Sequence, residues 1–279
     1  MTHDLTMSAA DLDAYFRRID YHSDQRPTLD TLRAIQSCHT AAIAFENLTP
    51  LTRQPVRLDP ASLLQKLVHD RRGGYCFEQN LLLRQVLQTL GFQVTGLAAR
   101  VRWNVPDDVI TARGHMLLRV DLDQQPYIVD VGFGGMTPTG PLRLTTEIEQ
   151  RTPHEPFRVI AADGTYTLQA LVDQAWKPVY RFDLQEQQLP DYEVTSWYLS
   201  NHPDSHFVTS LIAARPDAGR RYALRNNQFT VHHLDGASER RTLSSVAELR
   251  ATLEDVFRLT LPDTPALDAA FERILAQSA

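Results

Sequence analysis

The stretch from Arg72 to Asn80, Arg-Gly-Gly-Tyr-Cys-Phe-Glu-Gln-Asn, is the part of the sequence best suited to chemistry. Two glycines lead into Cys76, and the apolar spacing that follows predicts a helix over residues 77–90. Thiols react as thiolates, and a helix N-terminus stabilises negative charge through its dipole and its unpaired N–H groups. The same N–H groups can hold the oxyanion of an acyl transfer. We therefore interpret Cys76 as a nucleophile; the alternative is a small buried residue beside a tight turn.

A cysteine nucleophile needs a base, and His115 is the best placed of the ten histidines in the chain. It begins an alternating strand over residues 115–122 and lies on the more polar face of that strand. Asp130 lies on the predicted return strand, after a turn at Asp123-Gln124. If that turn has two residues, Asp130 is diagonal to His115, with α-carbons roughly 7–8 Å apart. A slip of one residue would turn Asp130 to the other face, so the pairing depends on the register.

Cys76, His115 and Asp130 together supply a nucleophile, a base and a group that orients the base. Taken alone, the histidine and the aspartate could be an ordinary strand-end residue and a solvated acid. Glu46 and Arg72 are a second predicted pair, because Glu46 lies among apolar residues and needs a partner if it is buried. We expect this pair to support the loop that presents the thiol; the alternative is two exposed charges that contribute little.

The chain changes character twice, which predicts three parts to position these residues. Segment 1–91 has mainly helical spacing, and Asp11 and Thr28 are expected to cap its first two helices. Segment 92–200 contains short alternating stretches typical of strands, although residues 191–203 are expected to form a connection. Segment 201–279 mixes predicted strands (222–224 and 229–232) with predicted helices (244–258 and 265–276).

Bulk composition excludes several classes of protein. The 279 residues are 43% hydrophobic and 22% charged, which is ordinary globular composition. A net charge of -6 creates no field that favours nucleic acid, and no apolar run approaches the roughly 20 residues that span a bilayer. Two cysteines suggest a reducing compartment, and the N-terminal Met-Thr-His-Asp-Leu-Thr-Met is unlike a signal peptide. We expect a cytoplasmic protein without nucleic-acid, membrane or metal partners; a homodimer is left open.

Five stretches lie in order along most of the chain: Ala44-Phe45-Glu46-Asn47-Leu48, residues 72–80, Gly114-His115, Asp130-Val131-Gly132-Phe133-Gly134 and His202-Pro203-Asp204-Ser205-His206-Phe207-Val208. In this order they resemble the arylamine N-acetyltransferases, particularly the bacterial N-hydroxyarylamine O-acetyltransferases. The Arg-Gly-Gly-Tyr-Cys stretch is highly specific, whereas Gly-Phe-Gly alone would be weak. Ala44 departs from the pattern, because the family more often has proline there, but it touches no proposed catalytic group.

The resemblance implies an α+β fold built around a papain-like Cys-His-Asp core of Cys76, His115 and Asp130. It implies an N-terminal helical domain, a central β-barrel domain and a C-terminal α/β lid, for which we expect boundaries near residues 91 and 200. It also implies that Phe133 lines an acceptor pocket, where an aromatic wall suits a flat aryl group. The alternative for Phe133 is a place in the barrel core.

Further contacts with substrate and coenzyme A are predicted around this core. Tyr75 and Phe207 are predicted substrate contacts, together with Phe133. Gly132 and Gly134 could offer backbone N–H groups to the phosphates of coenzyme A. Arg220-Arg221 is a weaker candidate, because an arginine pair in a loop is more often solvated surface.

The implied activity is a ping-pong acetyl transfer with acetyl-coenzyme A as co-substrate and no metal. Cys76 would take the acetyl group and pass it to an arylamine, an arylhydrazine or an N-hydroxyarylamine, with His115 as base. One alternative is an amide synthase of the same family that takes a carrier-bound acyl group. Another is a thiol hydrolase that uses the same triad with water as acceptor. A third, non-catalytic binding module would leave Cys76 inert.

Overall fold

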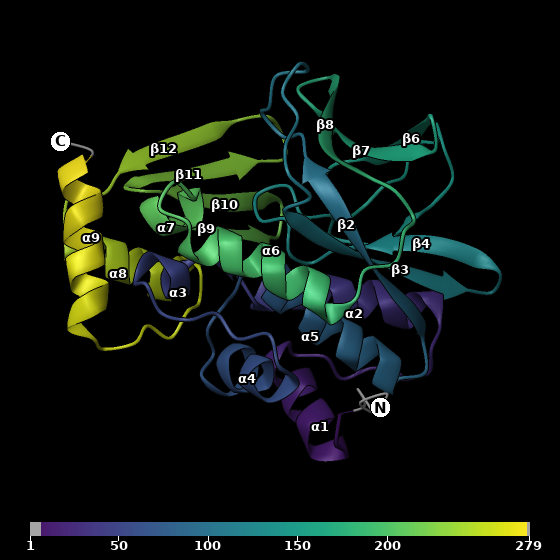
Figure 1. Cartoon of the computed structure of the whole chain (residues 1–279), viewed down its shortest axis with the longest axis horizontal. Coiled ribbons are helices and arrows are strands. Elements are labelled where there is room, and N and C mark those ends of the chain that lie inside the picture. The colour runs from purple at the N-terminus through teal and green to yellow at the C-terminus, as the bar shows by residue number, and fades with distance from the viewer. Residues whose placement is uncertain (1–6, 278–279) are drawn as a thin grey trace.

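In a computed structural model of the chain, which describes residues 7–277, the first third is helical (Figure 1). Residues 1–6, which hold most of the N-terminal stretch unlike a signal peptide, lie outside the described residues. Ser8 caps α1 (Ala9–Arg18) by accepting a hydrogen bond from the Asp11 N–H, so the prediction that Asp11 is the cap is wrong. Thr28 caps α2 (Leu29–Ala42) as predicted. The other helical segments here are α3 (Leu48–Leu51), α4 (Pro60–Leu64), a π-helical turn at Gln65–His69 and α5 (Cys76–Thr89).

A seven-stranded antiparallel sheet in the middle of the chain curls into a nearly closed barrel. Its strands are β2 (Gln93–Val101), β3 (His115–Leu122), β4 (Gln125–Val129), β5 (Leu142–Arg143), β6 (Phe157–Ala162), β7 (Thr165–Val172) and β8 (Ala175–Phe182). They follow the order β5-β4-β3-β2-β8-β7-β6. Isolated bridges from Thr146 to Val159 and from Gln150 to Phe157 connect the segment after β5 to β6 at the opposite edge. The barrel interior is filled by apolar side chains from the strands, which gives the sheet its own core.

The hairpin of β3 and β4 has the register on which the predicted His115–Asp130 pair depends. Leu122 pairs with Gln125 across a two-residue turn, so the register that the pair requires is the one that the structure has. Both faces of β3 are buried at the start of the strand. His115 and Leu117 face the barrel, and Met116 packs towards the helices. The face described as more polar is therefore interior at the start of the strand.

A second sheet joins the beginning and the end of the chain. Its first strand, β1 (Phe45–Glu46), comes from the helical third and pairs with β9 (Ile212–Asp217). The sheet continues through β10 (Arg220–Arg225), β11 (Gln228–His233) and β12 (Ser238–Thr242). A separate apolar core lies between this sheet and the helical segments α8 (Val246–Ala251), the π-helical turn at Thr252–Val256 and α9 (Pro265–Gln277), at the left of Figure 1.

Helix α6 (Leu189–Asn201) lies across the middle of the molecule in Figure 1, followed by α7 (His206–Thr209). The prediction of a connection over residues 191–203 is wrong, and the reason is an inverted pattern of burial. The buried positions at helical spacing are Tyr192, Ser196 and Ser200, whereas Val194, Trp197 and Tyr198 are exposed. The sequence of α6 therefore shows no apolar stripe that would predict a helix.

No described helix, α6 included, is both long and apolar enough to cross a membrane.

Candidate active site

Cys76 is the first residue of α5, which places its thiol at the positive end of a 14-residue helix. The Glu78 carboxylate accepts a hydrogen bond from the Tyr75 N–H at 3.1 Å, which satisfies one of the donors at the helix start. The thiol is buried, and its Sγ lies 3.8 Å from the Gly114 carbonyl oxygen, immediately before His115. The predicted position of the cysteine at a helix N-terminus is confirmed.

His115 and Asp130 form a buried pair beside this thiol. The imidazole Nε2 lies 2.7 Å from Asp130 Oδ2, which leaves Nδ1 as the ring nitrogen for the Cys76 sulfur. Burial alone disfavours the imidazolium, but the Asp130 carboxylate outweighs burial, and a hydrogen bond with Cys76 reinforces it. Together they raise the pKa of His115 to about 10. The site therefore favours a protonated imidazole at neutral pH.

Asp130 is fixed by neighbours, two of which, Asn80 and Gln36, the sequence did not single out as functional. Asn80 Nδ2 donates to Asp130 Oδ1 at 3.0 Å, and the Gly132 N–H donates to the same oxygen at 2.8 Å. Gln36 Nε2 donates to the Asp130 carbonyl oxygen at 3.2 Å. Asn80 lies one helical turn after Cys76 inside the recognised stretch, so its sequence position could have predicted a role at the site. Nothing in the sequence around Gln36 could have done so. These contacts hold the carboxylate toward His115.

Gly132 has a steric role in place of the predicted one. A Cβ at this position would lie 2.6 Å from the Cys76 Cα, a distance that real Cβ contacts do not reach. Its N–H is already given to Asp130, so the prediction that it donates to a phosphate of coenzyme A is wrong. Gly134, at φ +84°, lines the cavity described below, and its proposed contact stays a prediction.

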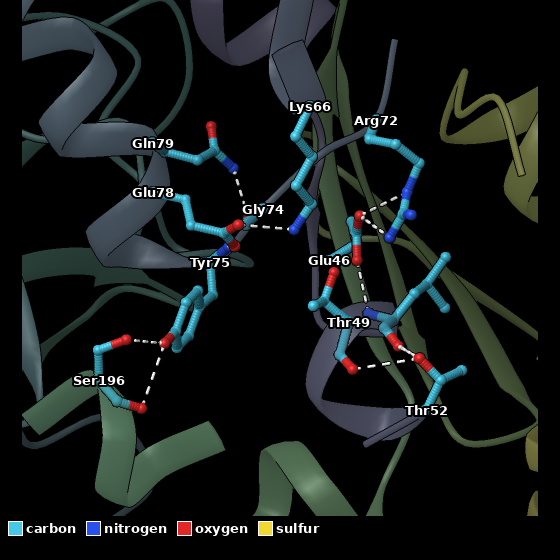
Figure 2. A network of polar contacts seen from close by, with 11 residues as sticks. Glu46, Thr49, Thr52, Lys66, Arg72, Gly74, Tyr75, Glu78, Gln79 and Ser196 are labelled. Carbon is cyan, nitrogen blue, oxygen red and sulfur yellow. Dashed lines mark hydrogen bonds and ion pairs between the residues drawn. The ribbon is translucent and has the colours of Figure 1, made fainter. Parts of the chain in front are cut away.

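Two buried ion pairs flank the loop that leads to Cys76 (Figure 2). Arg72 donates to Glu46 Oε1 from Nη2 at 2.7 Å and from Nε at 3.0 Å, so the predicted contact is confirmed. Lys66 Nζ lies 2.7 Å from Glu78 Oε1, a pair that sequence reasoning missed. Burial raises the pKa of Glu78, while for Glu46 the nearby Arg72 and Lys66 outweigh burial and lower the pKa. Each of the two carboxylates is thus paired with a cation.

A chain of neutral hydrogen bonds supports the same loop from behind. The Tyr15 hydroxyl lies 2.8 Å from His39 Nδ1, and His39 Nε2 lies 3.0 Å from Gln79 Oε1. Gln79 Nε2 then donates to the Gly74 carbonyl oxygen at 2.9 Å, as Figure 2 shows. Burial lowers the pKa of His39 to about 3, so its ring is neutral and bridges the two partners. Nothing local in the sequence marks this chain of contacts.

A cavity of about 530 Å³, here called the Cys76 cavity, opens at the thiol and is lined mostly by apolar side chains. Phe133 and Phe207 line it as predicted, and the Phe133 ring meets the His115 ring edge to face at 5.1 Å. Tyr75 is not among the described residues of its wall. Its ring packs edge to face against Phe207, with 5.5 Å between the ring centroids. Its hydroxyl contacts Ser196 of α6 (Figure 2), and its predicted substrate contact stays a prediction.

The arginine pair Arg220-Arg221 also differs from expectation. The two residues begin strand β10 and do not lie in a loop. Arg221 is buried and forms an ion pair with Glu155, 2.5 Å between Nη2 and Oε2. Of the two, only Arg220 is solvated, and its contact with a phosphate stays a prediction. Among residues 7–277, no cluster of three or more His, Cys, Asp or Glu side chains could hold a metal ion.

A buried thiol at a helix start, beside an Asp-paired imidazole, is the arrangement of enzymes that use a cysteine nucleophile. A family model described as N-acetyltransferase matches residues 28–266. The chain is 42% identical over 276 residues to the arylamine N-acetyltransferase of Mycobacterium tuberculosis (strain ATCC 25618 / H37Rv), covering 96% of this chain and 97% of that protein. The chain belongs to the arylamine N-acetyltransferase family, as its motifs predict.

Two further similar proteins are named with a second activity or with a bound ligand. The chain is 39% identical over 254 residues to the arylamine N-acetyltransferase / N-hydroxyarylamine O-acetyltransferase of Salmonella typhimurium (strain LT2), which covers 90% of each. It matches the structure of Mycobacterium marinum arylamine N-acetyltransferase in complex with CoA with a TM-score of 0.91 at 42% identity. That match covers 94% of this chain and 99% of the other.

Proposed function

We propose that the chain is an acetyl-CoA-dependent acetyltransferase that carries the acetyl group on Cys76 and passes it to an aromatic amine, hydrazine or hydroxylamine. The observation that carries this proposal is the Cys76–His115–Asp130 arrangement, with 2.7 Å between Nε2 and Oδ2, at the base of a mostly apolar cavity. The names of the relatives support the donor and acceptor classes. Two free cysteines, Cys38 and Cys76, are in keeping with a reducing compartment such as the cytoplasm.

In the first half-reaction the Cys76 sulfur attacks the carbonyl carbon of the acetyl thioester. Its proton is held by His115, whose raised pKa, about 10, keeps the imidazolium formed. As the bond from carbon to the coenzyme A sulfur breaks, the leaving thiolate takes that proton from Nδ1. Asp130 stabilises the imidazolium throughout and fixes its orientation. The result is acetyl-Cys76, free coenzyme A and a neutral His115.

In the second half-reaction the acceptor nitrogen or hydroxyl oxygen attacks the thioester carbon of acetyl-Cys76. His115 takes the proton of the acceptor, and Cys76 leaves as a thiolate beside the renewed imidazolium. The Phe133 ring, which touches His115 edge to face, can pack against the face of an aryl group next to the thioester. The apolar wall of the Cys76 cavity thus favours aromatic acceptors over water.

Intact mass after incubation with acetyl-CoA tests this proposal against its alternatives. We expect a gain of one acetyl group on Cys76, discharged by an arylhydrazine. An amide synthase with a carrier-bound donor, or a thiol hydrolase, would show no stable adduct while Cys76 still alkylates normally. A Cys76→Ser protein should lose transfer by about 10³-fold or more, with Cys38→Ser as the matched control. Undiminished transfer by Cys76→Ser protein would contradict the cysteine mechanism.

A further inference from the structure

The wall of the Cys76 cavity carries very little charge. Most of its residues are apolar or glycine, and Arg225 is the one lysine or arginine among the described residues that line it. Arg225 is the last residue of β10 and pairs with Ile212 of β9, which lines the cavity as well. Its side chain is exposed. Apart from the His115 imidazolium at the base, Arg225 is therefore the one charged side chain of this mostly apolar wall, and it lies on the exposed rim.

Arg225 also differs from Arg215 and Arg221 of the same sheet, because its side chain has no hydrogen bond or ion pair with any described residue. Arg221 is held by Glu155 and by the Thr137 carbonyl oxygen. Arg215 donates to the carbonyl oxygens of Val256 and Ala41 and to the Asp217 carboxylate, so few of its guanidinium N–H donors are free. The guanidinium of Arg225 is thus available to a ligand.

The acetyl donor proposed above has an acetylated thiol at one end and phosphates at the other. The thioester must reach the Cys76 sulfur at the base of the cavity, so the anionic end must lie towards the rim. A guanidinium binds phosphate oxygens through two parallel N–H donors, which a lone lysine cannot do. The chain has a net charge of -6, so a local cation offsets repulsion of an anionic substrate.

We propose that Arg225 binds a phosphate group of the acetyl donor at the mouth of the Cys76 cavity. The inference rests on the proposed function, since it names the residue that recognises the anionic end of its co-substrate. In this proposal the charge of Arg225 at the rim of the Cys76 cavity selects the acetyl donor, whereas Cys76 and His115 at the base carry out the transfer.

A neighbouring cavity supplies a matched control. It measures about 640 Å³, shares Thr111 with the Cys76 cavity and is bordered by three arginines, Arg100, Arg102 and Arg181. Arg100 and Arg102 donate to loop carbonyl oxygens, whereas Arg181 is exposed and unpaired with any described residue. Arg181 therefore matches Arg225 in charge, exposure and freedom but lines a different cavity.

The test compares donors with and without phosphates in Arg225→Gln, Arg225→Lys, Arg181→Gln and the unchanged protein. The rate of Cys76 acetylation is measured as kcat/KM for acetyl-CoA, for S-acetylpantetheine and for p-nitrophenyl acetate. For Arg225→Gln we expect kcat/KM for acetyl-CoA to fall about tenfold, with both phosphate-free donors unchanged. Arg225→Lys should keep part of the difference, and Arg181→Gln should behave like the unchanged protein. Added salt should lower kcat/KM for acetyl-CoA less in Arg225→Gln than in the unchanged protein.

The remaining outcomes separate the two proposals. If no donor acetylates Cys76 in the unchanged protein, the proposed function fails before Arg225 is in question. If Arg225→Gln loses all three donors equally, the residue has a structural role and the phosphate contact is overturned. If acetyl-CoA is unaffected by Arg225→Gln, or if only Arg181→Gln loses it, the phosphates lie elsewhere and the proposal is again overturned.

Discussion

The buried pair of His115 and Asp130 sets the protonation of the site. Asp130 is fully buried, and its Oδ1 accepts from Asn80 and Gly132 while its Oδ2 faces His115. A carboxylate with both oxygens engaged favours the imidazolium strongly, which is why burial does not neutralise the ring. The sulfur therefore lies beside a cation at neutral pH.

Asp130→Asn should remove the negative charge that stabilises the His115 imidazolium while it keeps a side chain of the same size. The retained oxygen can still accept from Asn80 and Gly132, so the new amide would donate to His115 Nε2. The ring proton would then move to Nδ1, the nitrogen meant to take the proton of Cys76. We expect transfer to fall by about 10³- to 10⁴-fold, as in other triads.

The pH dependence of alkylation checks this prediction directly. Because the pKa of His115 is raised, its imidazolium is present below about pH 10 and lost above it. Iodoacetamide should therefore alkylate Cys76 at a nearly constant rate from about pH 8 down to about pH 6. In Asp130→Asn the rate should fall with pH over that range. A Cys38→Ser background removes the second thiol, and an unchanged profile in Asp130→Asn would contradict the assigned role.

The approach of the loop after β4 to the start of α5 decides how closely base and nucleophile meet. Gly132 touches Cys76 and Asn80 on α5, and the Asn80 side-chain oxygen accepts from the Val131 N–H at 3.1 Å. The barrel and the helical layer are thus joined at the site by a close backbone approach at Gly132 and by the side chains of Asn80 and Gln36. The buried pairs Glu46–Arg72 and Lys66–Glu78 fix the other side of the same junction.

Gly132→Ala is expected to separate the two elements. Its Cβ would lie 2.6 Å from Cys76 Cα and 2.8 Å from Asn80 Nδ2, so one of the elements must shift. A displacement of about 1 Å between base and nucleophile costs roughly 10²-fold in rate, which we expect in kcat/KM. Gly135→Ala is the matched control, because a Cβ there meets no atom within 4 Å. Equal activities of the two variants would argue against close backbone contact at the site.

Contacts join the segments on either side of residues 91 and 200, the expected domain boundaries. The boundaries themselves stay a prediction. Strand β1 belongs by sequence to the helical third yet pairs with β9. Asn47 follows it, and its side chain donates to the carbonyl oxygens of Phe207 and Ser210 and accepts from the Ile212 N–H. One buried amide thus joins the first third to the segment that carries the Cys76 cavity wall.

Asn47→Ala should therefore destabilise the entire fold. It would leave two carbonyl oxygens and one N–H without their present partner, at a cost of about 2–4 kcal/mol in the free energy of unfolding. Urea denaturation followed by fluorescence would measure the loss. The control Asn201→Ala removes an exposed amide and should cost less than about 1 kcal/mol. A small effect of Asn47→Ala would mean that the two ends of the chain are joined by other contacts.

Local pattern by itself determined several features of this protein. The glycines before Cys76 and the apolar spacing after it predicted a helix start at the thiol, because caps and periodicity act within a few residues. The polar residues at Asp123-Gln124 predicted a turn, whereas the register of the β3–β4 hairpin, on which the side of Asp130 depends, was only a supposition until the structure gave it. Five stretches in family order, of which the one around Cys76 is the most specific, were enough to recognise the family.

Only the tertiary structure decided which distant residues meet at the site. Gln36 reaches Asp130 from 94 positions away, and Asn47 reaches Ser210 from 163. Helix α6 escaped prediction because it buries hydroxyl groups, and Arg225 is singled out among the exposed arginines by its place on the wall of the Cys76 cavity. Periodicity reports which face of an element is buried, but not which partner lies opposite. The partners are set when helices, barrel and second sheet pack together, since only packing brings such remote groups within hydrogen-bond distance.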